Sequence, residues 1–326
     1  MTRREALALL LVSACGGRVA PPPANAPTPA LTLSPAVDLL PSAGLVWLVD
    51  ARLRELFTSS LLMPAIATVL PEDRLDAFAK RHGGVDLRQA TDLAIAGYPE
   101  TVLAVADAVL DPVRVESAFT SRAVSVDGRA VDGPVTRTWG TVGSSRQQIA
   151  IFGREAVALE QGRFGPLMAA EYFARGKLRR ALPALKAEPL ARAATLLGDA
   201  PLRAFAPGPF EGAWARGLGG LLAGATAAAG AATPIGTPQP GLALRFVLTG
   251  AWGADAPAAA ERLRAAFEVL AGDSIGRLLG LDRPLVASSS SGDAEALRLQ
   301  VSLDAGRLAH GLHAATDATI AEIMAL

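Results

Sequence analysis

The spacing of apolar positions along the chain changes between the period of a strand and the period of a helix. Apolar residues at every second position predict strands, and apolar residues three or four positions apart predict amphipathic helices. The clearest strand is predicted at Gly241–Gly250 and the clearest helix at Ala256–Ala271. From Val37 onward the chain mixes both kinds of segment, which predicts an α+β fold.

The order of the predicted elements is similar in the two halves of this body. Strands are predicted at 44–50, 91–97, 101–109, 201–206, 241–250, 284–289 and 296–303, with a meander over 123–160 that turns at Asp127-Gly128, Asp132-Gly133 and Gly143-Ser144. Helices are predicted at 52–57, 61–70, 72–81, 111–121, 163–175, 188–197, 210–232, 256–271 and 304–326. This order predicts two related lobes, 37–198 and 199–326, each an antiparallel-rich sheet packed against helices. No residue-level repeat accompanies it.

The first 36 residues follow neither period. A short basic region, Met1–Glu5, precedes a nine-residue apolar run from Ala6 to Ala14. A membrane-spanning helix needs about 20 residues, so this run has instead the proportions of a signal-peptide core. Residues 16–36 are rich in proline and carry no apolar period, which predicts an extended linker.

The four residues Val12-Ser13-Ala14-Cys15 follow a branched apolar, small, small, cysteine pattern. They resemble the lipobox of bacterial lipoproteins, and all four positions match. The resemblance implies that a signal peptide, residues 1–14, is cleaved between Ala14 and Cys15. It also implies that the Cys15 thiol carries a diacylglyceryl group. The mature protein would then carry three palmitate-like acyl chains in all. Two or more chains hold a protein stably on a membrane.

The same resemblance implies a location in the cell envelope. Gly16 follows the cysteine where an Asp would retain the protein in the inner membrane, so the sequence favours the outer membrane, facing the periplasm or the surface. Thr2-Arg3-Arg4 resembles a twin-arginine export signal, but the usual aromatic residue is replaced by Ala6. Ordinary secretion and twin-arginine export both stay open.

Charge and cysteine content exclude some chemistries. Lys plus Arg and Asp plus Glu number 31 each, and removal of Arg3, Arg4 and Glu5 with the signal peptide leaves 29 against 30. Such a balance argues against a general nucleic-acid binder. The single cysteine allows no intramolecular disulfide and no Cys-based zinc site. The basic cluster 175–180 either contacts anionic headgroups or is a solvated segment.

Few residues suggest catalysis or metal binding. His310 and His313 are three residues apart on a predicted helix, so they are weak candidates for a metal pair, with Asp304 and Asp317 as the nearest carboxylates. The alternative is two polar residues on a terminal helix. Asp50, at the end of a buried strand, is either a site residue or the N-cap of the next helix. Ser288–Ser291 are expected in a polar hairpin turn, and no cofactor is predicted.

Taken with the anchor, these observations favour a non-enzymatic envelope lipoprotein that acts by binding or scaffolding. Its expected partners are the membrane, through the N-terminal lipid, and an envelope protein or a lipid. Two alternatives stay open. One is an envelope hydrolase with dispersed carboxylates, and the other is a carrier for lipids or lipoproteins.

Replacement Cys15→Ser tests the predicted anchor. A serine hydroxyl does not replace the thiol in lipid attachment, so we expect the variant to lose fatty-acid labelling and to leave the membrane fraction. Ser13→Ala keeps a small residue in the lipobox and is expected to retain both properties. Cys15→Ser protein that stayed on membranes would contradict the anchor.

Overall fold

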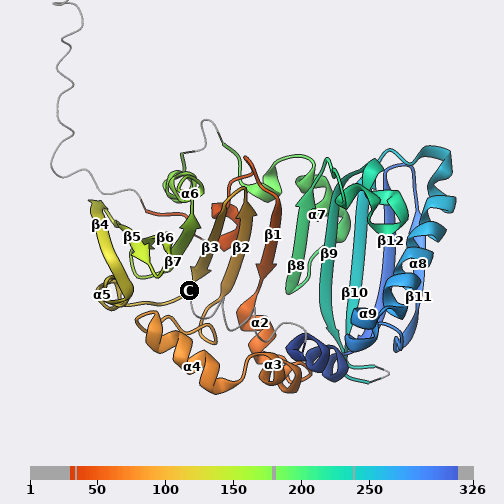
Figure 1. Ribbon diagram of the computed structural model, residues 1–326, viewed down its shortest axis with the longest axis horizontal. Helices are drawn as coiled ribbons and strands as arrows, with labels where there is room; N and C mark the ends of the chain where they lie inside the picture. The colour runs from red at the N-terminus through yellow and green to blue at the C-terminus, as the bar shows by residue number, and fades with distance from the viewer. Residues whose placement is uncertain (1–29, 34, 178–180, 238, 315–326) are drawn as a thin grey trace, which may run out of the picture. The chain divides into compact units, whose positions relative to one another are not determined.

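Twelve strands form the centre of the structure. This computed structural model describes residues 30–33, 35–177, 181–237 and 239–314. The strands are β1 (Trp47–Ala51), β2 (Asp92–Tyr98), β3 (Thr101–Asp107), β4 (Ala123–Asp132), β5 (Val135–Val142), β6 (Ser145–Phe152), β7 (Ala156–Gly162), β8 (Leu202–Pro207), β9 (Ala225–Ile235), β10 (Gly241–Gly250), β11 (Val286–Gly292) and β12 (Ala296–Asp304). They make one antiparallel sheet in the order β11-β12-β10-β9-β8-β1-β2-β3-β7-β6-β5-β4 (Figure 1).

Helices pack against both faces of this sheet. The α-helices are α2 (Leu53–Thr58), α3 (Met63–Val69), α4 (Glu72–Arg81), α5 (Pro112–Arg122), α6 (Pro166–Ala174), α7 (Leu190–Leu197), α8 (Ala256–Gly272) and α9 (Ser274–Leu278). The 3-10 segments are η1 (Ala36–Leu39), η2 (Ala184–Lys186), η3 (Trp214–Arg216), η4 (Leu218–Gly224) and η5 (Gly253–Asp255). Residues 305–314 are also helical. The predicted α+β class is confirmed.

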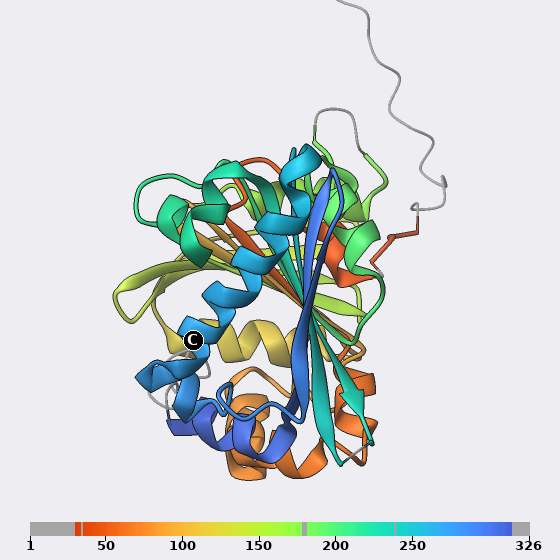
Figure 2. The ribbon, with the colours of Figure 1, turned by 90° about the vertical axis from the view of Figure 1, so that its right-hand side faces the viewer.

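The two faces of the sheet are covered differently. On one face, called here the covered face, η1, α6, η2 and α7 bury a long apolar cluster that includes Leu48, Leu103 and Phe205. On the other face, α5 packs over β4–β7 at one end and α8 packs over β11 and β12 at the other. Figure 2 shows α8 and α7 on opposite sides of the sheet. Over the middle strands on this second face, α2 and α4 bury one end, where Ala51 packs with Leu53 and Leu75. The remainder receives less cover, and Trp47 and Val102 stay partly exposed there.

The two predicted lobes share this one sheet. The described residues from Leu31 onward belong to one compact unit, and the predicted boundary at 198/199 falls between α7 and β8. Leu33 is buried, and the backbone N–H of Thr32 donates to the carbonyl of Ala174 at 2.7 Å. Packing therefore already includes residues of the segment predicted as linker. Whether the two halves are related repeats stays a prediction.

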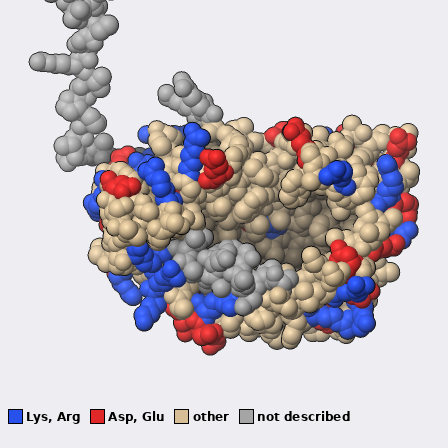
Figure 3. Space-filling view, in the orientation of Figure 1, with Lys and Arg blue, Asp and Glu red and all other residues tan. Residues whose placement is uncertain are grey.

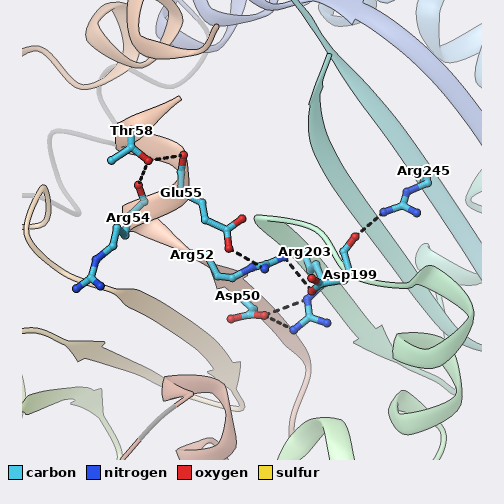
Figure 4. A network of polar contacts seen from close by, with 8 residues as sticks. All are labelled: Asp50, Arg52, Arg54, Glu55, Thr58, Asp199, Arg203 and Arg245. Atoms are coloured by element: carbon cyan, nitrogen blue, oxygen red, sulfur yellow. Dashed lines mark hydrogen bonds and ion pairs between the residues drawn. The ribbon is translucent and has the colours of Figure 1, made fainter. Parts of the chain in front are cut away.

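Strands β1 and β8 join the halves. Their register places Asp50 opposite Arg203, and the guanidinium donates to Asp50 Oδ2 at 2.5 and 3.0 Å. Asp50 is only 5% exposed. Close by, Arg52 donates to Glu55 and Asp199 at 2.8 Å each, and Arg245 on β10 donates to the Asp199 carbonyl (Figure 4). Charged side chains from both halves thus meet at the junction.

One long predicted helix is wrong. Residues 210–232 form η3, η4 and most of β9 instead. Gly219 and Gly220 have φ of 67° and 85°, outside the helical range, and they end any continuous helix there. The alanines that follow pair with β8 and β10 on both sides. Pairing in the sheet outweighs the helix propensity of alanine, which is a weak local preference.

Three smaller predictions also need correction. Asp50 lies inside β1, and Arg52 occupies the N-cap position of α2, so Asp50 is not a helix cap. Asp127 lies at a bulge in β4 rather than in a turn, and Gly128 pairs with Trp139, whose ring occupies the space of a side chain at Gly128. Ser288–Ser291 belong to the edge strand β11, where alternate hydroxyls face solvent.

Other local predictions are confirmed. Asp111 caps α5, since its Oδ1 accepts from the backbone N–H groups of Val113 and Arg114. Asp304 likewise accepts from the N–H of Arg307 at the start of the last helix. β10 has the predicted bounds, and α8 begins at the predicted residue and ends one residue later.

Removal of one partner of the Asp50–Arg203 pair tests the junction. Asp50→Leu leaves a largely buried guanidinium without its carboxylate, so we expect a loss of about 3 kcal/mol in the free energy of unfolding. Asp50→Leu/Arg203→Met removes both charges and is expected to recover much of that loss. Urea unfolding measures both variants.

The exposed pair Arg264–Glu268 on α8 provides a matched control. Glu268→Ala is expected to cost less than about 1 kcal/mol, because solvent screens that pair. A cost for Asp50→Leu no larger than this would contradict a structural role for the junction pair.

Candidate functional site

The middle strands carry apolar side chains on the face opposite the covered one. In the register of β1, β2, β3 and β8, alternate residues point to each face. The residues that point away from the covered face are all apolar: Trp47, Val49, Ala51, Leu93, Ile95, Gly97, Val102, Ala104, Ala106, Leu202, Ala204 and Ala206. We call this set the open face.

Part of the open face is accessible to solvent, whereas Ala51 and Ala106 are buried. Trp47 and Val102 are each 39% exposed and Leu202 is 37% exposed. Ala204 is exposed as well, and Val49 is half-buried. Figure 3 shows a hollow over β8 and β9 whose surface is mostly neither acidic nor basic. Exposed apolar patches mark binding sites more often than ordinary surface does.

Two glycines allow aromatic rings to lie across the strands here. A Cβ at Gly97 would come within 2.1 Å of the Trp47 indole nitrogen, so the indole lies where a side chain at Gly97 would be. On β9, a Cβ at Gly230 would lie 3.4 Å from the Phe246 ring. Phe246 also packs against the apolar cluster under α8. The two rings therefore add flat apolar area to this side of the sheet.

The backbone beneath the open face has its hydrogen-bonding partners. β1 pairs with β2 and β8, and β8 pairs with β1 and β9. These strands offer no free edge to an added strand. Recognition on the open face therefore depends on apolar side-chain contact rather than on backbone hydrogen bonds.

The charged residues of the same strands lie on the covered face. They are Asp50, Asp92, Asp107 and Arg203. Asp92 is directly opposite Asp107. Burial raises the pKa of Asp92 above its usual range, and the nearby carboxylates of Asp107, Asp50 and Glu55 raise it further, while Arg52 lowers it. This acidic group is next to the junction pair rather than on the open face.

The predicted lipid-attachment site, Cys15, and the cleavage position, Ala14, lie outside the described residues, as do Arg179, Arg180 and Asp317. Within the basic cluster 175–180, the Arg175 guanidinium donates to the backbone carbonyl of Asp132 at 2.9 Å. The same group pairs with the Asp132 carboxylate at 3.0 Å. That arginine is therefore engaged with the turn between β4 and β5.

The two histidines proposed as metal ligands lie on the helix after β12. His310 Nδ1 is 2.8 Å from the carbonyl of Gly306. Asp304, named as a third ligand, instead accepts from the Arg307 N–H and from the Gln239 side chain. In the part of the chain that the structure describes, no group of three or more His, Cys, Asp or Glu is arranged to hold a metal ion.

Comparisons with known proteins assign no family. No protein-family model and no curated protein sequence matches the chain. A solved structure described as "Structure of crystal form I of TP0453" is similar with a TM-score of 0.43 and 11% identity, and it covers 85% of this chain and 96% of that chain. Among the described helices, none has both the length and the apolar character needed to cross a membrane.

Sequence reasoning did not identify the open face. Most of the strands were predicted, and the one at 44–50 was predicted to be buried. One signal was present. Consecutive residues of a strand point to opposite faces, and β1 carries apolar side chains on both. Trp47 and Val49 point to one face, and Leu48 points to the other. Such a strand needs cover on both faces, and the sequence does not say whether both covers exist.

Replacement Asp92→Asn tests the electrostatics of the covered face. A carboxyl whose pKa is raised on folding stabilises the fold below its unfolded pKa, and this stabilisation is lost as the pH rises through the folded pKa. We therefore expect Asp92→Asn to be more stable than the wild type at pH 7, with the difference shrinking as the pH falls towards 4. Urea unfolding across this range measures it. A destabilised variant at pH 7 would contradict the effect.

Proposed function

We propose that the protein is a lipid-anchored protein of the cell envelope that binds an acyl-chain-bearing molecule on the open face. The observation that carries the proposal is the wholly apolar, partly exposed side-chain set of β1, β2, β3 and β8. This takes up the binding role expected from the sequence and gives it a surface. Of the alternatives, the proposal favours the lipid carrier.

The backbone pairing favours an acyl chain over a peptide. A peptide laid on these strands would bury its own N–H and C=O groups against apolar side chains without partners, which costs free energy for each group. An acyl chain has no such groups. Small alanines beside Trp47 leave a shallow surface onto which a flexible chain can settle. Burial of each CH₂ group contributes about 0.8 kcal/mol.

The anchor supports the same reading. A lipid on Cys15 would hold the protein on a membrane through the predicted extended linker. The protein would then stay within reach of lipids. The folded body includes residues from Leu31 onward, so the tether would be residues 16–30, which at about 3.1 Å per residue extend to roughly 45 Å. The tether would therefore keep the open face close to a source of acyl chains without inserting the folded body.

A binding measurement tests this function. Full-length Cys15→Ser protein, stripped of bound lipid, is titrated with a fluorescent polyene fatty acid while energy transfer from tryptophan is recorded. We expect saturable binding. Ala204→Glu places a carboxylate on the open face, opposite Val49. Because this charge must be desolvated, we expect at least tenfold weaker binding.

Val131→Glu on the edge strand β4 is the matched control, since Val131 is also an exposed strand residue at 57%. Its affinity is expected to stay within twofold of the wild type. Circular dichroism checks that both variants fold. The proposal fails if the stripped protein binds no fatty acid, or if both variants bind as the wild type does.

A further inference from the structure

A second feature lies between α4 and α5, away from the open face. An open pocket of about 710 Å³ separates the two helices. Its lining contains four cationic side chains, two serines and no carboxylate. These polar residues are Lys80, Arg81, Arg114, Ser117, Ser121 and Arg122. Figure 3 shows basic side chains gathered over this part of the molecule, at the lower left.

Three of the four cations of this pocket have no carboxylate paired with them. Among the described residues, no carboxylate forms an ion pair with Lys80, Arg81 or Arg114. One acidic residue of each helix is engaged elsewhere. Asp76 on α4 bonds to Arg88 at 2.6 Å, and Glu116 on α5 bonds to Arg129 at 2.5 Å. The pocket therefore keeps a net positive charge.

Close packing at Gly83 and Gly84 holds the cations together. Gly83 has a φ of +69°, and a Cβ there would lie 2.4 Å from the carbonyl oxygen of Arg114. The loop after α4 can therefore touch the first turn of α5. Next to it, the Arg114 guanidinium lies 3.7 Å from the Cβ position of Gly84. These contacts bring Arg114 next to the C-terminal end of α4, which carries Lys80 and Arg81.

The side chain of His82 lies beside the cations of the pocket. Its ring stacks on Phe78 with centroids 4.3 Å apart, and Arg122 Nη2 lies 3.4 Å from its Nδ1. Burial lowers the pKa of His82 to about 3, and the charges of Arg122 and Arg81 contribute. Burial and the charge of Arg81 also lower the pKa of Arg122 to about 10. Each additional positive charge is thus disfavoured here.

We propose that the pocket between α4 and α5 binds a phosphate group. Lys80, Arg81 and Arg114 are exposed at its mouth, and the Ser117 and Ser121 hydroxyls line it. Arginine guanidinium groups match phosphate oxygens with paired N–H donors. The Ser117 hydroxyl supplies a further donor, whereas the Ser121 hydroxyl already donates to the Ala118 carbonyl. A negative phosphate would also relieve the repulsion among the cations. The phosphate belongs either to a lipid headgroup or to a free phosphate.

This inference does not depend on the proposed function. The phosphate pocket and the open face are formed by different residues, so loss of fatty-acid binding leaves the phosphate prediction unchanged. The reverse also holds. The two sites are tested with separate probes and separate variants.

The test uses the full-length Cys15→Ser protein, so that a lipid anchor does not bind vesicles by itself. Calorimetry at constant ionic strength measures inorganic phosphate. Co-sedimentation measures vesicles of phosphatidylglycerol, with and without inorganic phosphate as competitor. Arg81→Gln/Arg114→Gln is expected to weaken binding at least tenfold. Arg262→Gln/Arg283→Gln removes the same charge from exposed positions elsewhere and is expected to change binding less than twofold.

The arms distinguish the source of the phosphate. Vesicle binding that inorganic phosphate displaces assigns a lipid headgroup, and phosphate binding without vesicle binding assigns the free anion. Either result supports the pocket if only the pocket variant weakens it. Absence of binding to both probes overturns the proposal. Equal weakening by the two double variants also overturns it, because net charge alone would then explain the binding.

Discussion

The pairing of β1 with β8 is the constraint on which the remaining structure depends. These short strands bring together segments about 150 residues apart, and the buried Asp50–Arg203 pair lies across them. Because a buried charge without its partner is costly, this register is strongly preferred over a shifted one. One sheet therefore runs through both halves, where two separate sheets would have closed around two separate cores.

The helices that the structure describes do not cover both faces of the twelve-stranded sheet completely. The covered face receives η1, α6, η2 and α7, while the opposite face has its main helices near the two ends. The central strands carry apolar residues on both faces, and all four of their charged residues point to the covered one. This differs from the usual half-exposed sheet, in which polar residues face solvent. The open face follows from that difference.

Local sequence signals predicted local structure well and long-range contacts poorly. β10, α8 and the Asp111 cap follow from spacing and residue type over a few positions. Residues 210–232 were predicted as a helix, because alanine favours a helix locally. These residues carry no signal for the strands β8 and β10 that pair with them in the sheet. The α4–α5 pocket joins Lys80 to Arg114 across 34 positions, through a contact at Gly83 that composition does not reveal. The lipid-anchor prediction at Cys15 rests on the sequence.

Native-state amide hydrogen exchange measures the central claim most directly. If β1–β8 pairing unites the sheet, the amides of β1, β8 and β9 should exchange only through global unfolding, with the same free energy as the best-protected strands. The Asp50→Leu variant should lower protection equally on both sides of the junction. Exchange of β8–β12 through a separate, cheaper opening that left β1–β3 protected would contradict the account.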